Sequence, residues 1–173
     1  MKILCLADLH LYFVQNKEKI TEYKKQLFNL FSSIKCDLIL IAGDIFESTI
    51  MQTQLNPYKE LRNLFYFFEN IPIICCLGNH EFAYSNIIDV KKYYNSFLER
   101  YNVHYLDIEN SFEFLDLNII GNVLWYDNSL KANSFIIDDK IDNNWLDSTI
   151  QNFIPSKECK QNKNLILNSI KKK

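Results

Sequence analysis

The sequence predicts an α/β fold built on a parallel sheet, because three short apolar runs alternate with two helical patterns. Each run is five to seven residues long, is rich in Ile, Leu and Cys, and lacks polar alternation. Runs of this kind are typical of strands that are buried on both faces. The order strand, helix, strand, helix, strand implies right-handed crossovers between parallel neighbours. The three runs are residues 3–7, 38–42 and 71–77.

Amphipathic patterns predict three helices. Apolar residues recur at i, i+3 and i+4 spacing in residues 17–34 and again in residues 57–69, where Pro57 suits the first helical turn. A third helix is expected over residues 87–101. The remaining expectations are a strand at 103–106, two strands at 112–115 and 118–124 with a turn around Asp116, mostly loop at 128–144, and a weak helix from 157 onward.

Length and charge bound the class of protein. The 173 residues suffice for one domain with a sizeable core, and 48% hydrophobic with 23% charged residues argues against disorder. A formal net charge of -2 excludes a strongly basic nucleic-acid module as the default, although a nucleic-acid end is still an allowed substrate. The sequence leaves the oligomeric state open.

The cellular compartment follows from two absences in the sequence. No apolar run approaches the roughly 18 residues of a membrane span, and the apolar stretch at the N-terminus is too short for a signal peptide. The five cysteines include no Cys-x-x-Cys pair, and Cys5, Cys75 and Cys76 lie inside apolar runs. We therefore expect a cytoplasmic protein with free thiols and no membrane contact.

Polar residues follow each of the three predicted parallel strands. Asp8 and His10 follow the first, Asp44 follows the second, and Asn79 and His80 follow the third. Ligands of open parallel sheets bind outside the carboxyl ends of the strands, so we expect these five side chains to converge on one cleft. Two of the three glycines in the chain, Gly43 and Gly78, directly precede Asp44 and Asn79. Glycine at these places lets the backbone approach a ligand closely.

The chemistry of this set indicates a metal site. Carboxylate, imidazole and amide oxygens suit divalent ions such as Mn, Fe or Zn. Asp8 and His10 can reach one ion if the chain kinks as it leaves the strand. Asp44 can reach the same ion and offer its second oxygen to another, which Asn79 would bind without adding charge.

The sequence here resembles the calcineurin-like metallophosphoesterases. The resemblance is firm over about residues 1–85, and a looser glycine-to-tryptophan segment follows at residues 121–127. It implies the α-β-β-α sandwich of that family, represented in this chain mainly by its first parallel sheet with flanking helices. The motifs that carry it are Asp8-x-His10, Gly43-Asp44 and Gly78-Asn79-His80-Glu81.

The resemblance also implies an activity and a role for each residue. The activity is metal-dependent hydrolysis of phosphate mono- or diesters by a metal-bridging hydroxide, with two divalent ions, Mn first and Fe, Zn or Ni as alternatives. Asp8 and His10 would bind the first metal, Asp44 would bridge both, and Asn79 would bind the second. His80 would stay off the metals and give a proton to the leaving alkoxide. The implied partner is a phosphorylated small molecule or a phosphodiester.

One departure from the family pattern leaves two interpretations of the chain open. The family completes its site with later histidines, whereas this chain contains only His10, His80 and His104. We expect residues 1–173 to be a single metallophosphoesterase domain that lacks its C-terminal part. The alternative is a natural short form, a degenerate phosphoesterase-like domain that binds a partner or a phosphorylated ligand without catalysis.

Other residues favour structural roles. His104 is expected to be structural, Trp125 and Asp127 are expected to serve core packing and a turn, and Glu81 either orients a neighbour or lies at the surface. A nucleotide binder of the Rossmann type is disfavoured, because no glycine-rich phosphate loop opens the first helix.

Overall fold

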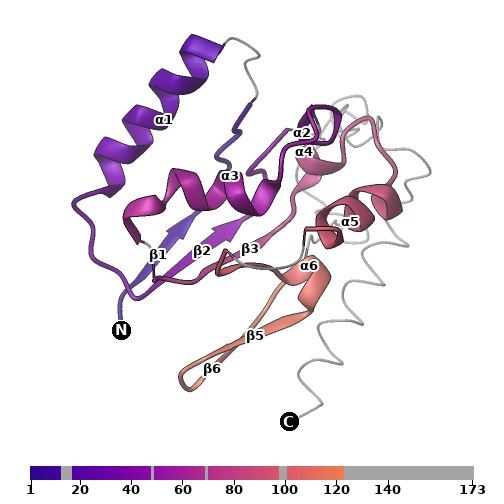
Figure 1. The fold of residues 1–173 in the computed structure, drawn as a ribbon. Helices are drawn as coiled ribbons and strands as arrows, with labels where there is room; N and C mark the ends of the chain where they lie inside the picture. The colour runs from indigo at the N-terminus through magenta and orange to yellow at the C-terminus, as the bar shows by residue number, and fades with distance from the viewer. Residues whose placement is uncertain (13–16, 48, 69, 98–100, 123–173) are drawn as a thin grey trace, which may run out of the picture.

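A computed structural model describes residues 1–12, 17–47, 49–68, 70–97 and 101–122 (Figure 1). The predicted segment at residues 128–144, the predicted terminal helix, Trp125 and Asp127 lie outside the described residues. The described elements are β1 (Ile3–Leu6), α1 (Lys17–Phe31), β2 (Leu38–Ala42), α2 (Thr49–Gln52), α3 (Pro57–Leu64), the 3₁₀ turn η1 (Tyr66–Phe68), β3 (Ile73–Cys76), α4 (Asn79–Phe82), α5 (Ile87–Asn95), β4 (Val103–Tyr105), α6 (Leu106–Glu109), β5 (Ser111–Phe114) and β6 (Leu117–Ile120).

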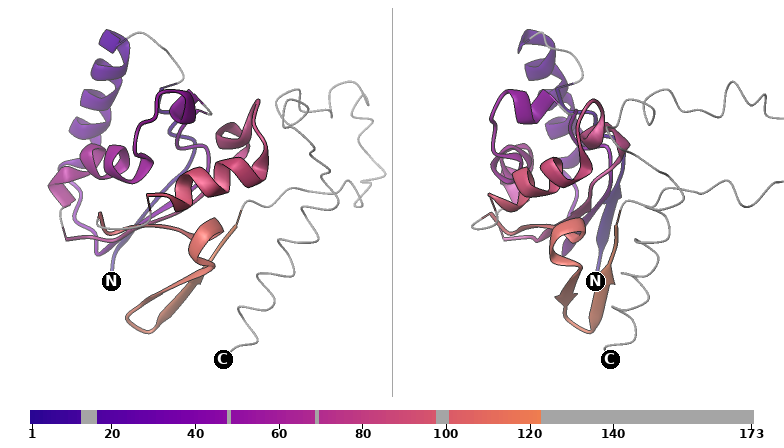
Figure 2. Two further views of the ribbon diagram at one scale, coloured as in Figure 1. Left: turned by 45° about the vertical axis from the view of Figure 1, so that its right-hand side comes forward. Right: turned by 90° about the vertical axis from the view of Figure 1, so that its right-hand side faces the viewer.

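The predicted parallel sheet is present. Its four strands lie in the order β1-β2-β3-β4, each pair is parallel, and the register places Cys5 beside Leu40 and Ile41 beside Cys75. Each new strand is added on the same side of the previous one, so right-handed crossovers put the connecting helices on one face of the sheet. Figure 2 shows α1, α3 and α5 gathered on one side of the strands.

The main core lies between these helices and that face of the sheet. Alternate strand residues such as Ile39, Ile41 and Ile73 point into it and are 0–2% exposed. Large aromatic side chains fill the space above them. Those that are fully buried there are Phe46, Tyr58, Phe65, Phe82, Tyr94 and Tyr105.

The opposite face of the sheet carries a smaller cluster. Leu38 and Ile74 pack there against Leu106 and against the antiparallel hairpin β5–β6, which projects beyond the sheet in Figure 1. This face is covered unevenly. On β1, at the sheet edge, Ile3 and Cys5 are exposed, so the prediction that all three runs are buried on both faces is wrong for β1.

Helix and strand boundaries differ from the sequence patterns by a few residues. Asn56 and Asn86 cap α3 and α5 through their side-chain oxygens, a signal that fits the predicted starts. The helical pattern at 57–69 breaks at Phe65, whose N–H bonds to two carbonyls, and continues as η1. The short helices α2, α4 and α6 were not predicted, since four residues are too few for a periodic signal.

The expectations about membrane contact and free thiols are compared with the described residues. None of the described helices combines the length and the apolar character that a bilayer crossing requires. The four described cysteines are free thiols: Cys36 and Cys75 are buried, Cys76 is half-buried, and Cys5 is exposed.

Candidate metal centre

The segment after β1 is hydrogen-bonded to the segment after β2 and alternates between more exposed and buried residues. Backbone N–H groups of Asp8, His10 and Leu11 donate to carbonyls of the segment after β2, at 3.2, 2.9 and 2.8 Å. Leu9 and Leu11 are buried at 4% and 1% exposure, whereas Asp8 is exposed and His10 is half-buried. Apolar burial of every second residue therefore directs both predicted ligands toward one site.

The backbone is strained at three of the predicted site residues. Asp8, His10 and Asp44 have φ values of 54°, 45° and 51°, a region that residues with a side chain rarely adopt. Each such residue costs on the order of 1–3 kcal/mol, so the surrounding bonds must hold it in place. The chain therefore kinks at Asp8 and His10 as it leaves the first strand, which was the condition for both side chains to reach one ion.

The two glycines permit a close approach between the second and third strand ends. A Cβ atom on Gly78 would lie 2.0 Å from Oδ1 of Asp44, which excludes any side chain there. The same Oδ1 accepts a hydrogen bond from the backbone N–H of His80 at 3.0 Å. Gly43 has a φ of +77°, which favours glycine. The expected reason for these glycines was a close approach of the backbone to a ligand, whereas Gly78 makes room for the Asp44 carboxylate.

Three of the predicted residues meet in one group. One ligand atom from each of Asp8, His10 and Asp44 lies within 4.8 Å of the other two. Nε2 of His10 lies 4.0 Å from Oδ1 of Asp8, and the Asp8 side chain is 66% exposed. Two carboxylates and an imidazole at this spacing can hold a divalent cation.

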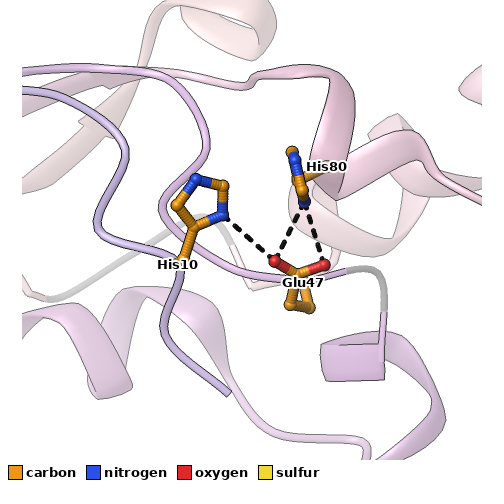
Figure 3. A group of neighbouring side chains, drawn as sticks. All are labelled: His10, Glu47 and His80. Atoms are coloured by element: carbon orange, nitrogen blue, oxygen red, sulfur yellow. Dashed lines mark hydrogen bonds and ion pairs between the residues drawn. The ribbon is translucent and has the colours of Figure 1, made fainter. Parts of the chain in front are cut away.

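A second group overlaps the first through His10. It consists of His10, Glu47 and His80, whose ligand atoms also lie within 4.8 Å of one another (Figure 3). Nδ1 of His80 lies 2.9 and 3.1 Å from the two Glu47 oxygens, and Nδ1 of His10 lies 3.1 Å from Oε1. The two imidazole rings are 4.4 Å apart, edge to face.

Glu47 was missed by sequence reasoning. It lies three residues after Asp44, and the two residues between them, Ile45 and Phe46, are fully buried. The signal that could have found it is this pattern, in which two buried apolar residues separate two acids at the end of a strand. An ionised carboxylate only accepts hydrogen bonds, so each Nδ1 that bonds to Glu47 carries the hydrogen. The second nitrogen of each ring faces away from Glu47, as Figure 3 shows.

Glu81 ties the second and third strand ends together. Its Oε1 accepts from the N–H groups of Ile45 and Phe46, and its Oε2 accepts from the N–H of Gly78, all at 2.7 Å. The side chain is 1% exposed, so the surface alternative is wrong and the orienting role is supported. Burial raises the pKa of Glu81 to about 8, against the opposing effect of the backbone donors.

The remaining predicted residues lie as follows. Asn79 is the half-buried first residue of α4, between Gly78 and His80. His104 lies within β4, where its Nδ1 is 3.0 Å from Oε2 of Glu109 and its ring contacts Phe112, consistent with the expected structural role. The structure therefore brings Asp8, His10 and Asp44 together and joins His80 to them through Glu47.

Comparison with known proteins identifies the class to which this fold and site belong. The family model of the calcineurin-like phosphoesterases matches residues 1–167, nearly the whole chain. The chain belongs to the calcineurin-like phosphoesterase family, as the strand-end motifs predicted. A comparison with curated proteins finds no match. The family implies divalent metal ions and phosphoester substrates.

Proposed function

We propose that this chain hydrolyses phosphate mono- or diesters with the help of two divalent cations, Mn²⁺ first among them. The observation that carries the proposal is the pair of overlapping groups that share His10 at the carboxyl ends of β1, β2 and β3. One group offers metal ligands and the other offers a proton donor with its own carboxylate. Membership of the family supports the same reaction class.

The donor set fits the proposed ions. Asp8, His10 and Asp44 would hold the first cation, and Asp44 and Asn79 would hold the second. Carboxylate oxygens with one imidazole are the ligands that Mn, Fe and Zn accept, and three carboxylates near two imidazoles make the site attractive to cations. When bound, the ions supply Lewis-acid stabilisation of the phosphoryl oxygens and an ionised water at neutral pH.

The hydrogen bond to Glu47 prepares His10 for its proposed role. Because Nδ1 of His10 donates to Glu47, the lone pair of its Nε2 is on the side of Asp8, 4.0 Å from Oδ1. Imidazole ligands of metals are commonly oriented by a carboxylate in this way. Glu47 therefore acts as a positioning residue for the metal site.

His80 is the proposed proton donor. Glu47 receives its Nδ1–H with both oxygens, which sets the plane of the ring and leaves Nε2 facing away. The backbone N–H of the same residue holds Asp44, so the proton donor and the shared carboxylate keep a fixed relation. With a second hydrogen on Nε2, His80 would give that proton to the leaving oxygen as the ester bond breaks and would keep its Nδ1–H on Glu47.

Two measurements on the full chain test this function. Calorimetric titration of the metal-free chain with Mn²⁺ is expected to show binding that Asp44→Ala removes and that Asp89→Ala, at an exposed acid of α5, retains. Mn²⁺-dependent release of nitrophenolate is expected from p-nitrophenyl phosphate, its bis ester, or both. Mn²⁺ binding without turnover of either ester would favour the non-catalytic binding domain, and no Mn²⁺ binding would overturn the metal site itself.

A further inference from the structure

An apolar cavity of about 240 Å³ adjoins the candidate metal centre. Asp8 and His10 form part of its wall, so the cavity is continuous with the site that would hold the phosphate. The rest of the wall comes from the segment after β1 and from the N-terminal half of α1: Leu9, Tyr12, Lys19, Ile20 and Tyr23.

The two tyrosines of the wall are held in place by their hydroxyl groups. The Tyr12 hydroxyl donates to the Glu60 carboxylate and accepts from Nζ of Lys24 at 3.0 Å. The Tyr23 hydroxyl donates to the carbonyl of Leu9 at 2.8 Å. Since both hydroxyls have partners, the rings contribute mainly apolar carbon surface to the cavity.

Further contacts hold the Tyr12 side of the wall in its position. The Tyr12 ring stacks on the buried Phe46 ring at 6.2 Å between centroids. Nζ of Lys24 also lies 3.1 Å from the Glu60 carboxylate, which closes a three-residue network linking the segment after β1 to α1 and α3. A wall that is already ordered lowers the entropy cost of binding.

The volume indicates the size of group that the cavity can surround. An apolar cavity of about 150 Å³ is enough to bind benzene, whereas drug-sized ligands occupy roughly 300–1,000 Å³. A volume of about 240 Å³ therefore suits one aromatic ring with a small substituent. Aromatic walls favour a planar ring through offset or edge-to-face contacts.

We propose that the substrate is a phosphate ester of a single-ring aromatic group, with the ring in this cavity and the phosphate at Asp8, His10 and Asp44. This inference rests on the proposed function and adds to it the class of the esterified group. The cavity is the specificity element, and Ile20, which is not among the proposed catalytic or metal-binding residues, is the wall residue best suited to a test.

The test compares the binding of phenylphosphonate and methylphosphonate, which are not hydrolysed, to the Mn²⁺-loaded chain by calorimetry. The expected result is an affinity for phenylphosphonate at least about tenfold higher, because tenfold corresponds to about 1.4 kcal/mol and burial of an apolar ring contributes more than that. Ile20→Trp, which fills the cavity, should bring the ratio of the two affinities close to one. The matched control is Leu30→Trp on the same helix, where Leu30 is 62% exposed and outside the cavity, and this variant should keep the ratio.

The outcomes separate this inference from the function on which it rests. Equal affinity for the two phosphonates in the unaltered chain, or a phenyl preference that survives Ile20→Trp, overturns the aromatic site alone. If neither phosphonate binds in the presence of Mn²⁺, the proposed function fails, and the aromatic site fails with it. Because the readout is a ratio, a variant that merely unfolds loses both affinities and is recognised at once.

Discussion

The regions around His80 and His104 contain nearly the same pair of side chains. In each, the imidazole Nδ1 lies close to a glutamate oxygen, at 2.9 Å in the His80–Glu47 pair and 3.0 Å in the His104–Glu109 pair. The imidazole side chains are 22% and 25% exposed. The shortest nitrogen–oxygen distance and the exposure of the imidazole therefore do not distinguish the two regions.

The difference lies in what surrounds each pair. His80 follows the end of β3, and Glu47 reaches it from the segment after β2 and also contacts His10. His104 lies within β4, its partner comes five residues later in the chain, and its ring contacts Phe112. A histidine–glutamate pair therefore does not by itself indicate a functional site. The His80–Glu47 pair is a candidate site because several strand ends converge there.

The largest expected contrast is in turnover. His80→Ala should lower kcat by roughly 10²–10⁴-fold, the usual contribution of a general acid, while Mn²⁺ stays bound. His104→Ala should leave kcat within about twofold, because its ring lies against Phe112 within β4. The measurements are steady-state kinetics and Mn²⁺ calorimetry on both variants. A loss of Mn²⁺ in His80→Ala would make His80 a ligand instead, and equal kcat losses would remove the distinction between the two regions.

A second contrast concerns metal affinity. Asp44→Ala should weaken Mn²⁺ binding by more than about 100-fold, since even a residue that only orients a ligand contributes about 10–100-fold. His80→Ala should change this affinity far less, because Asp44 alone is expected to contact both ions. Calorimetric titration of the two variants measures the difference. The same affinity in both would contradict the assignment of Asp44 as the shared ligand.

The glutamates provide a smaller and more selective test. Glu47→Gln should reduce Mn²⁺ affinity and turnover by about 10–100-fold, because one carboxylate orients both His10 and His80. Glu109→Gln, the matched change at the other pair, should leave both quantities near those of the unaltered chain. Kinetics and metal titration of the two variants check this, and an equal effect at Glu109 would show that the pairs are energetically alike.

The smallest expected effect is on the stability of the fold. It arises from Glu81, the buried acid in the region around His80. Burial raises the pKa of Glu81 from 4.5 to about 8, so between these values the folded chain binds more protons than the unfolded chain. The free energy of unfolding of the metal-free chain should therefore fall as pH rises from about 4.5 to 8 and level off above, with a slope of up to about 1.4 kcal/mol per pH unit. Urea unfolding at several pH values measures the slope.

Glu81→Gln is the control for that slope. Glutamine does not titrate, so the dependence over this window should flatten. Its amide N–H₂ would also face the N–H of Gly78, which costs about 1–3 kcal/mol for an unsatisfied buried donor. A slope that persists in this variant would assign the pH dependence to another group.

Much of the fold could be predicted because apolar runs and helical periodicity are local signals. The parallel order of β1, β2 and β3, the helices α1, α3 and α5, and the hairpin turn around Asp116 all follow such signals. The prediction fails where the burial of a strand depends on coverage by other elements. This is the case for β1, whose Ile3 and Cys5 are exposed at the sheet edge. The burial of a strand face depends on the elements that pack against it. The sequence of one strand does not predict which elements those are.

The candidate site divides in the same way. Asp8, His10, Asp44 and His80, which the structure groups together, were identifiable from the sequence by itself, because polar residues and glycine that end apolar runs are visible along the chain. The role of Asn79 stays a prediction. Only the tertiary structure revealed Glu47 as the common partner of His10 and His80, and Glu81 as the buried acceptor of the N–H groups of Ile45 and Phe46. The physical reason is distance along the chain. Hydrogen bonds between residues more than thirty positions apart depend on how the strand ends are placed in space, and the sequence pattern around one residue does not encode that placement.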